Sequence, residues 1–288
     1  MFEYDPPVVN RRLLSLLVVL SLPAAAAGQT VPVPEGAGTG PDTVFVEELT
    51  WTEVGARLRD GTRSVIVPTG GTEQNGPHMV LGKHNFIIRE ASERIARELG
   101  NTLVAPVIAY VPEGNLSPPS GHMRYPGAIT LPDEHFRVLL EMTARSFAVH
   151  GFENVIFIGD SGGNQRGMAA VAEMLNAEWE AAGSPSRVLY VADYYRGNGF
   201  RDWLLEQGFD AEAIGSHAGI TDTSQLWYVA PDQIRPEARV KDGGFRGSGV
   251  RGDPTLASPE LGEKGIEFKV STTVRRVREM LAERTGRN

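Results

Sequence analysis

Short apolar runs alternate with longer stretches of helical periodicity from about residue 43 to the end of the chain. The apolar runs predict β-strands at Ser64–Pro68, Thr102–Ile108, Val155–Ile158 and Arg187–Ala192. Apolar residues at helical spacing predict α-helices at Phe86–Leu99, Pro132–His150, Gly167–Ala182, Tyr195–Gln207 and Val270–Arg284. This alternation indicates an α/β domain with a mostly parallel sheet, in which functional side chains gather on loops at the carboxyl ends of the strands.

The size and charge of the chain narrow the classes of partner. With 288 residues, of which 41% are hydrophobic and 22% charged, the chain can form one large domain or two small ones. Its net charge of −8 provides no broad basic surface, so we do not expect it to bind nucleic acid. A small molecule or a peptide is the expected partner.

The N-terminal segment has the layout of a secretory signal peptide. Arg11 and Arg12 precede the apolar run Leu13–Leu22, and the small residues Ala24–Ala27 follow. A permanent membrane helix needs roughly twenty apolar residues, so a retained anchor is the weaker alternative. We therefore expect a signal peptide at 1–27, a flexible leader at 28–42, and a folded domain at 43–288 that is periplasmic or secreted and free of the membrane after cleavage. The chain has no cysteine, so its fold cannot rely on disulfides.

The string Gly-Asp-Ser-Gly-Gly at Gly159–Gly163 also surrounds the nucleophile of trypsin-like serine proteases. Those enzymes need an earlier histidine and aspartate on a two-barrel all-β fold, whereas here the string joins a predicted strand to a predicted helix. We therefore do not expect Ser161 to be a protease nucleophile. The turn either cradles an anion on its backbone N–H groups, or uses its glycines only for close packing.

The stretch Val67–Asn85, with the sequence VPTGGTEQNGPHMVLGKHN, places Glu73, His78 and His84 on a loop directly after a predicted strand. Carboxylate and imidazole groups this close together are typical of sites for zinc, manganese or iron. The alternative is a solvated loop whose histidines are incidental.

This stretch resembles the leading motif of the creatininase (creatinine amidohydrolase) family, Pro-x-Gly-x-x-Glu-Gln-His-Gly-Pro-His. Further segments resemble family motifs in the same order, at His122–Leu131, His150–Asn164, His217–Ser224 and Gly252–Gly265. The resemblance implies a three-layer α/β/α single domain, commonly assembled into homo-oligomers, with a two-metal hydrolytic site. It also implies cleavage of non-peptide C–N bonds in amides, and in some members of peptides or formamides.

The metal ligands that the resemblance implies are mostly replaced in this chain. By position they fall on Glu73, Asn75, His84, Ser161 and Asp222; only Glu73 is identical, and Asp222 is a shorter carboxylate than the family's glutamate. Asparagine and serine are weak ligands for such metals, while His84 restores one imidazole. We therefore expect a remodelled site for one or two divalent ions, zinc, manganese or iron, at Glu73, His84 and Asp222, assisted by Asn75, Asp160 and Ser161.

The catalytic residues that we expect are Glu73 and His217. His217 matches a family histidine near the metals and is expected to donate a proton to the leaving nitrogen; its alternative is a structural histidine bonded to a backbone carbonyl. We expect contacts with substrate, or support of the ligands, from His78, His122, Arg124, Tyr125, Asn164 and Trp227, although core packing is the commoner use of such a tryptophan.

Together these features predict an exported, metal-dependent amidohydrolase that acts on a small amide-like substrate and forms a homo-oligomer. The replaced ligands leave a second hypothesis, a creatininase-fold protein whose site has decayed and which binds a small molecule or has a structural role. A serine hydrolase that uses Ser161 is a distant third.

Overall fold

A four-stranded sheet lies at the centre of the computed structural model, which describes residues 31–239, 245 and 247–285. Its strands are β1 (Ser64–Thr69), β2 (Thr102–Val104), β3 (Asn154–Gly159) and β4 (Arg187–Tyr190), in the order β2-β1-β3-β4. All three strand pairs are parallel. The strands are runs of valine, isoleucine and phenylalanine because parallel strands are buried on both faces. The predicted α/β fold with a mostly parallel sheet is confirmed.

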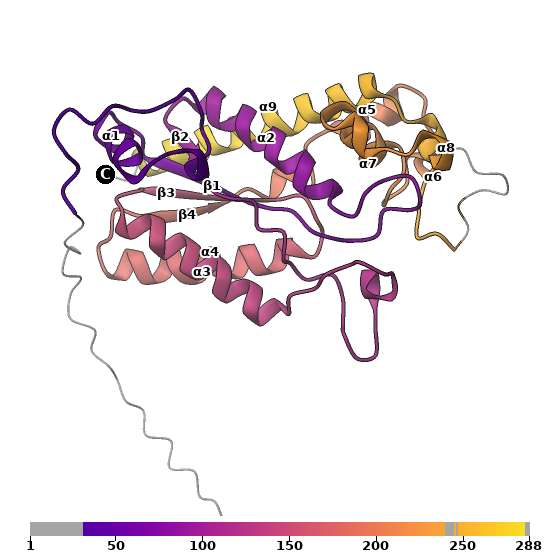
Figure 1. The fold of residues 1–288 in the computed structure, drawn as a ribbon, viewed down its shortest axis with the longest axis horizontal. Coiled ribbons are helices and arrows are strands. Elements are labelled where there is room, and N and C mark those ends of the chain that lie inside the picture. The colour runs from indigo at the N-terminus through magenta and orange to yellow at the C-terminus, as the bar shows by residue number, and fades with distance from the viewer. Residues whose placement is uncertain (1–30, 240–244, 246, 286–288) are drawn as a thin grey trace, which may run out of the picture.

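Helices cover both faces of the sheet, which gives three layers (Figure 1). One face packs against α2 (Lys83–Leu99), α7 (Ile220–Val229) and α9 (Pro259–Thr285), through a core that includes Ile66 and Ile156. The other face packs against α3 (Asp133–Val149) and α4 (Asn164–Ala181), through the residues that alternate with them along the strands. The helices nearest the site, α2, α4 and α7, therefore have fixed starting points relative to the ends of β1 and β3.

Shorter elements complete the described chain. The remaining helices are α1 (Trp51–Arg59), α5 (Phe200–Glu206), α6 (Ala211–Ile214) and α8 (Pro236–Arg239). The 3₁₀ turns are η1 (Val46–Glu48), η2 (Gly121–Arg124), η3 (Ala192–Tyr194), η4 (Pro231–Gln233) and η5 (Pro254–Leu256). Within the described residues, none of the helices has the length and apolarity to span a membrane. The expected signal peptide lies outside the described residues, so export stays a prediction.

Several predicted boundaries were wrong for local reasons. β2 ends at Val104 instead of Ile108, because Pro106 has no N–H to donate to a neighbouring strand. The helix predicted from Tyr195 begins at Phe200, after two glycines with positive φ. The last helix begins at Pro259, eleven residues before the predicted Val270, and proline is favoured at a helix's first position. Helix α7 was not predicted.

Candidate functional site

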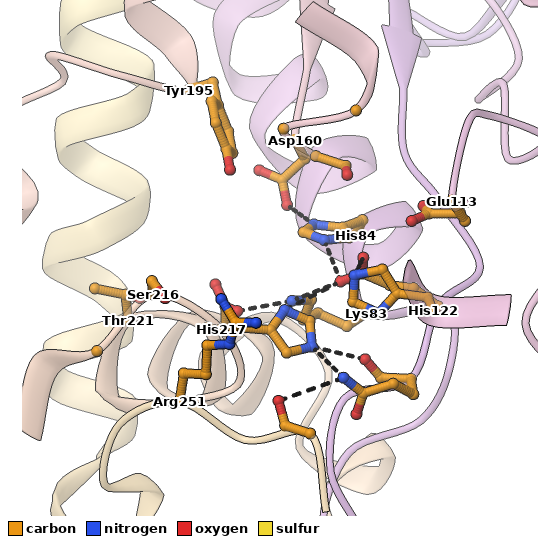
Figure 2. A pocket seen from close by; sticks show the side chains of 18 of the residues that line it. Lys83, His84, Glu113, His122, Asp160, Tyr195, Ser216, His217, Thr221 and Arg251 are labelled. Atoms are coloured by element: carbon orange, nitrogen blue, oxygen red, sulfur yellow. Dashed lines mark hydrogen bonds and ion pairs between the residues drawn. The ribbon is translucent and has the colours of Figure 1, made fainter. Parts of the chain in front are cut away.

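A pocket of about 760 Å³ opens at the carboxyl ends of β1 and β3 (Figure 2). Its walls come from the loops after these two strands, the first turns of α2 and α7, the η2 turn, helix α9 and the segment around Arg251. Parallel strands bring their following loops to one edge of the sheet. Segments that are far apart in the sequence therefore contribute side chains to a single pocket.

The glycine turn after β3 is built for close packing. Asn164, at the start of α4, donates from its side-chain amide to the Oγ1 and carbonyl oxygens of Thr69 and to the carbonyl of Gly70. A Cβ on Gly163 would lie 2.4 Å from the carbonyl oxygen of Pro112, so the turn has no space for a side chain there. Ser161 lines the pocket, and no histidine of the described chain forms a hydrogen bond with its hydroxyl. This geometry supports the close-packing interpretation of the turn.

Two basic side chains at the start of α2 lie between acidic ones. Lys83 is fully buried, and its Nζ lies 2.7 Å from Asp222 Oδ2 and 3.2 Å from Glu73 Oε1. The neighbouring His84 bridges two carboxylates, with Nε2 2.8 Å from Glu73 Oε1 and Nδ1 2.6 Å from Asp160 Oδ2. Both ring nitrogens of His84 are therefore occupied by carboxylates.

The charges of this carboxylate cage, defined as Glu73, Asp160 and Asp222, are balanced by protein cations. Lys83 and His84 supply two of them, and Lys269 of α9 contacts Asp160 Oδ1 as the third. Burial opposes the charge on Lys83, but Asp222 and Glu73 outweigh it and raise the pKa of the lysine. Burial and Lys83 oppose protonation of His84, but Glu73 and Asp160 outweigh them and raise its pKa to about 9. At neutral pH the three anions of the cage therefore contact three protein cations.

The pKa values of the cage carboxylates shift in the opposite direction, downwards. Burial would raise the pKa of Glu73, but Lys83 and His84 outweigh burial and hold that pKa far below its usual range. Burial and Lys83 compete in the same way at Asp222, whose pKa is also far below normal. Asp222 additionally accepts a hydrogen bond of 2.8 Å from the backbone N–H of Ala218, the only described residue other than glycine with a positive φ, of 53°. This contact fixes the backbone directly after His217.

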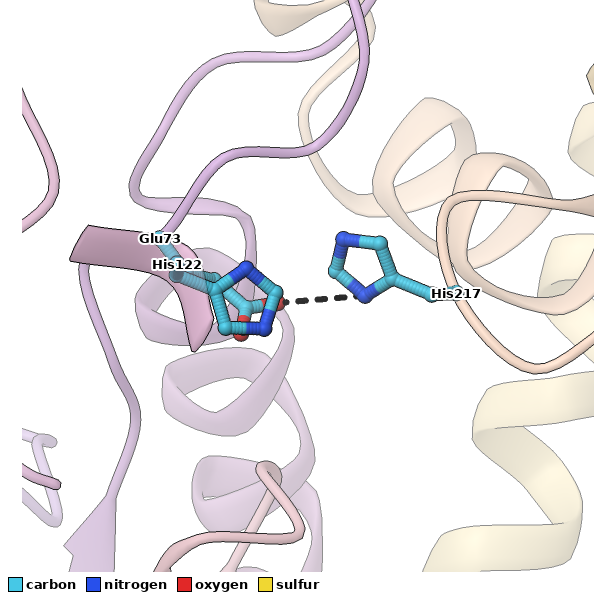
Figure 3. Close-up of side chains that lie close together, drawn as sticks. All are labelled: Glu73, His122 and His217. Atoms are coloured by element: carbon cyan, nitrogen blue, oxygen red, sulfur yellow. Dashed lines mark ion pairs between the residues drawn. The ribbon is translucent and has the colours of Figure 1, made fainter. Parts of the chain in front are cut away.

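Two further side chains, His122 and His217, converge on Glu73 (Figure 3). His122 Nε2 lies 3.1 Å from Glu73 Oε2, and His217 Nδ1 lies 3.6 Å from Glu73 Oε1. One ligand atom from each of these residues lies within 4.8 Å of the others, which makes Glu73, His122 and His217 a candidate metal site. We call these three residues the Glu-His-His trio. It combines an expected metal ligand with two histidines that we expected in other roles.

Both histidines of the trio can offer a lone pair to a metal. Burial and the Lys83 charge lower the pKa of His217 to about 4, and burial also lowers the pKa of His122, so both rings are neutral at pH 7. His217 Nε2 lies 2.7 Å from the carbonyl oxygen of Gln74, which can only accept a hydrogen bond. The same nitrogen lies 3.0 Å from the side-chain amide nitrogen of Gln74, but its shorter contact is with the carbonyl oxygen. The shorter contact assigns the proton of His217 to Nε2 and leaves Nδ1 facing Glu73.

Glu113 is a site residue that the sequence interpretation missed. It lies on the loop after β2, lines the pocket, and is only 5% exposed. Burial and the charge of Glu73 raise the pKa of its carboxyl to about 9, so it carries a proton at neutral pH. A Cβ on Gly71 would lie 2.5 Å from Glu113 Oε1, which shows how closely the β1 loop packs against this carboxyl. No motif marks Glu113, because its Pro-Glu-Gly context resembles an ordinary turn.

Of the other residues predicted for the site, some line the pocket and others pack behind it. Arg124 and Tyr125 line the pocket. Asn75 donates from its amide to the backbone carbonyls of Glu73, Val80 and Leu81, and so holds the β1 loop in shape. His78 is fully buried with Nε2 2.9 Å from Thr223 Oγ1, and burial lowers its pKa to about 4. Trp227 is outside the pocket lining and packs against the core, with Arg239 over its ring.

Comparison with known proteins points to one family. Residues 47–277 match the family described as "Creatininase: Creatinine amidohydrolase". The chain is 26% identical to the "Mycofactocin precursor peptide peptidase" of Mycolicibacterium smegmatis, over 82% of this chain and 92% of that protein. It is 25% identical to the "Creatinine amidohydrolase" of Pseudomonas putida, over 67% of this chain and 74% of that protein.

Solved structures show the same fold. The structure named "Creatininase Mn" has a TM-score of 0.69 and 23% identity to this chain, over 83% of this chain and 98% of its own. A mutant creatininase described as "Zn-Zn type" has the same score and identity, over 83% of this chain and 99% of its own. Those two proteins are named with manganese and with zinc.

Proposed function

Because this chain belongs to the creatininase family, we propose that it hydrolyses an amide-like C–N bond with the help of one divalent metal ion at the Glu-His-His trio. The observation that supports this proposal most directly is that one carboxylate and two neutral imidazoles converge inside the pocket. When bound, such an ion polarises the carbonyl group of an amide and lowers the pKa of a water molecule. Two histidines and a carboxylate suit zinc first, with manganese and iron as alternatives.

The spacing of the trio fits an ion. Two ligands that are each about 2.1 Å from a tetrahedral zinc lie roughly 3.4 Å from each other. The contacts of Glu73 with His122 and His217 are 3.1 Å and 3.6 Å, so little movement is needed. The Gln74 carbonyl accepts the remaining proton of His217, which is the usual way in which a metal-binding histidine is oriented.

Apart from Glu73, whose Oε2 faces His122 and not the cations, the carboxylate cage does not fit an ion. His84, Asp160 and Asp222 were expected among the ligands, but each is already paired within the protein. A divalent cation placed there would face Lys83, Lys269 and a protonated His84, and like charges in a buried site repel strongly. We therefore propose one ion per chain, where the resemblance alone implied two.

Proton transfer is assigned to Glu113. A leaving nitrogen needs a proton donor, and a donor must hold its proton at working pH. Glu113 does so, because its pKa is raised to about 9, whereas His217 has a pKa of about 4 and its Nε2 proton is directed to Gln74. We propose that Glu113 donates the proton, and that Lys83 holds Oε1 of Glu73 in place through their 3.2 Å contact.

A binding protein without catalysis is the second candidate. The balanced charges of the carboxylate cage favour it, because a site that needs no metal for neutrality can exist as a stable scaffold. This candidate predicts that ligands stabilise the protein without being hydrolysed.

Metal removal separates the two candidates. We expect purified protein to hydrolyse members of a panel of N-acyl amino acids, cyclic amides and dipeptides, to lose this activity after chelation, and to regain it with zinc, manganese or iron. His217→Ala and Glu73→Gln should abolish hydrolysis, while His135→Ala, which changes an exposed histidine on α3, should not. Full hydrolysis after complete chelation would contradict the metal assignment, and stabilisation by panel members without turnover would support the binding protein.

A further inference from the structure

Four arginines line the pocket without a carboxylate partner in the described chain: Arg124, Arg196, Arg201 and Arg251. By contrast, ten arginines outside the pocket form ion pairs with aspartate or glutamate. The chain carries a net charge of −8, so acidic side chains are plentiful elsewhere. Some arginines outside the pocket, such as Arg59, also form no ion pair, so the distinguishing feature is that four guanidinium groups without a carboxylate partner line one pocket.

Arg251 is held beside the Glu-His-His trio by its backbone. Its N–H donates to the carbonyl of His217 at 2.8 Å, and its carbonyl accepts from the N–H groups of His217 and Ser216. A Cβ on Gly215 would lie 1.8 Å from the Arg251 carbonyl oxygen, so this close approach requires glycine. Figure 2 shows the Arg251 side chain beside His217. Main-chain hydrogen bonds therefore hold the backbone of Arg251 against that of a candidate metal ligand.

Among the described residues that line the pocket, no anion is left to pair with Arg251, because Glu113 holds a proton at neutral pH. Glu73, Asp160 and Asp222 are balanced by Lys83, His84 and Lys269, as described above. The Arg251 side chain is exposed, lines the pocket, and forms no hydrogen bond or ion pair with any of these three carboxylates. Guanidinium groups form their strongest contacts with planar or tetrahedral oxyanions, by two parallel N–H···O bonds. A bound ligand is the remaining source of such an oxyanion.

We propose that the pocket takes a substrate that carries an oxyanion, a carboxylate or a phosphate, near its amide bond, and that Arg251 binds this group. That the substrate is an amide rests on the proposed function. Recognition of the oxyanion requires neither the metal nor turnover, because it depends on Arg251 and the other arginines of the pocket. The two claims can therefore fail separately.

The test measures binding to chelator-treated protein by calorimetry, with N-acetylphenylalanine, its neutral amide and phenyl phosphate as probes. We expect the wild-type protein to bind N-acetylphenylalanine or phenyl phosphate about tenfold more tightly than the neutral amide, since a charged hydrogen-bonded pair is lost in the latter. Arg251→Ala should abolish this preference, and Arg251→Lys should keep part of it. Which anion binds more tightly identifies the carboxylate or the phosphate class.

The matched control is Arg59→Ala, which removes the same charge from an exposed position at the end of α1, outside the pocket. It should leave the preference unchanged. Equal binding of the three probes, no binding of any probe, or a preference that survives in Arg251→Ala would overturn the proposal. A preserved preference together with no amide hydrolysis under any metal condition would overturn the proposed function alone.

Discussion

Lys83 is the residue that decides how many ions this site can hold. Its ammonium group is fully buried between Glu73 and Asp222, at the distances of a hydrogen-bonded ion pair. Removing one partner of such a buried pair leaves the other charges uncompensated, which is far more costly than losing a surface ion pair. The lysine therefore acts as a permanent cation within the carboxylate cage.

Replacing Lys83 should exchange a protein cation for a metal ion. In chelator-treated protein, Lys83→Ala should lower the free energy of unfolding by about 3–5 kcal/mol, because Glu73 and Asp222 lose their buried partner. With zinc or manganese in excess, the variant should regain stability and bind one more ion per chain than wild type, as measured by elemental analysis. Lys264→Ala, which removes an exposed lysine paired with Glu267, should change neither quantity. A Lys83→Ala protein of wild-type stability would contradict the role assigned to this lysine, as would unchanged metal content.

Glu113 makes stability depend on pH in a defined direction. Its pKa is raised from 4.5 to about 9 on folding, so between these values the folded chain keeps a proton that the unfolded chain releases. The free energy of unfolding therefore falls as pH rises through this range. Glu113→Gln keeps the shape of the neutral acid without this penalty, so at pH 8 it should be more stable than wild type by about 1–3 kcal/mol.

The gain from Glu113→Gln should shrink towards zero near pH 4, where both states of wild type hold the proton. Denaturant titrations at several pH values measure it, and Glu206→Gln, at an exposed glutamate of α5, is the control. A gain that does not depend on pH, or a loss of stability at pH 8, would show that Glu113 is ionised in the folded protein. The same variant should also be impaired in hydrolysis, since glutamine cannot donate the required proton.

Sequence reasoning found the acidic part of the site more readily than the basic part. Glu73 and Asp222 were found because their positions match family motifs. Lys83 stands next to His84 in the same motif, but its partner Asp222 is 139 residues away, and only the fold brings them together. Glu113 and Arg251 belong to no motif, and their significance depends on which neighbours are unpaired. Single-sequence patterns do not contain that information.

At the scale of elements, the sequence predicted the long and regular parts correctly. β1 and β3 are continuous apolar runs, and α2, α3 and α4 have clear helical periodicity, so their existence and order followed from pattern alone. Helix α7 was missed because it is short and because the preceding glycines, Gly215 and Gly219, are typical of a loop. Yet its first turn carries Asp222, and the preceding loop carries His217. An element that the sequence did not predict therefore builds part of the site.

At the scale of the whole molecule, the parallel sheet explains where the site lies. The carboxyl ends of β1 and β3 are adjacent, so the loops with Glu73 and Asp160 meet at one edge, as expected from the topology. In a chain of net charge −8, the pocket at this edge of the sheet contains both the charge-balanced carboxylate cage and the arginines that have no carboxylate partner. Export and homo-oligomer formation stay predictions, because they depend on residues or partner chains outside the described structure.

The most direct test of the account is the metal content of the purified wild-type protein, determined by elemental analysis after equilibration with zinc, manganese or iron and removal of free ions. We predict about one ion per chain, and loss of that ion in His217→Ala, because the Glu-His-His trio is the only part of the pocket that fits a divalent cation within the described residues. Two ions per chain would show that the protein cations of the cage give way to a metal. No bound ion under any of these conditions would contradict the metal-dependent function itself.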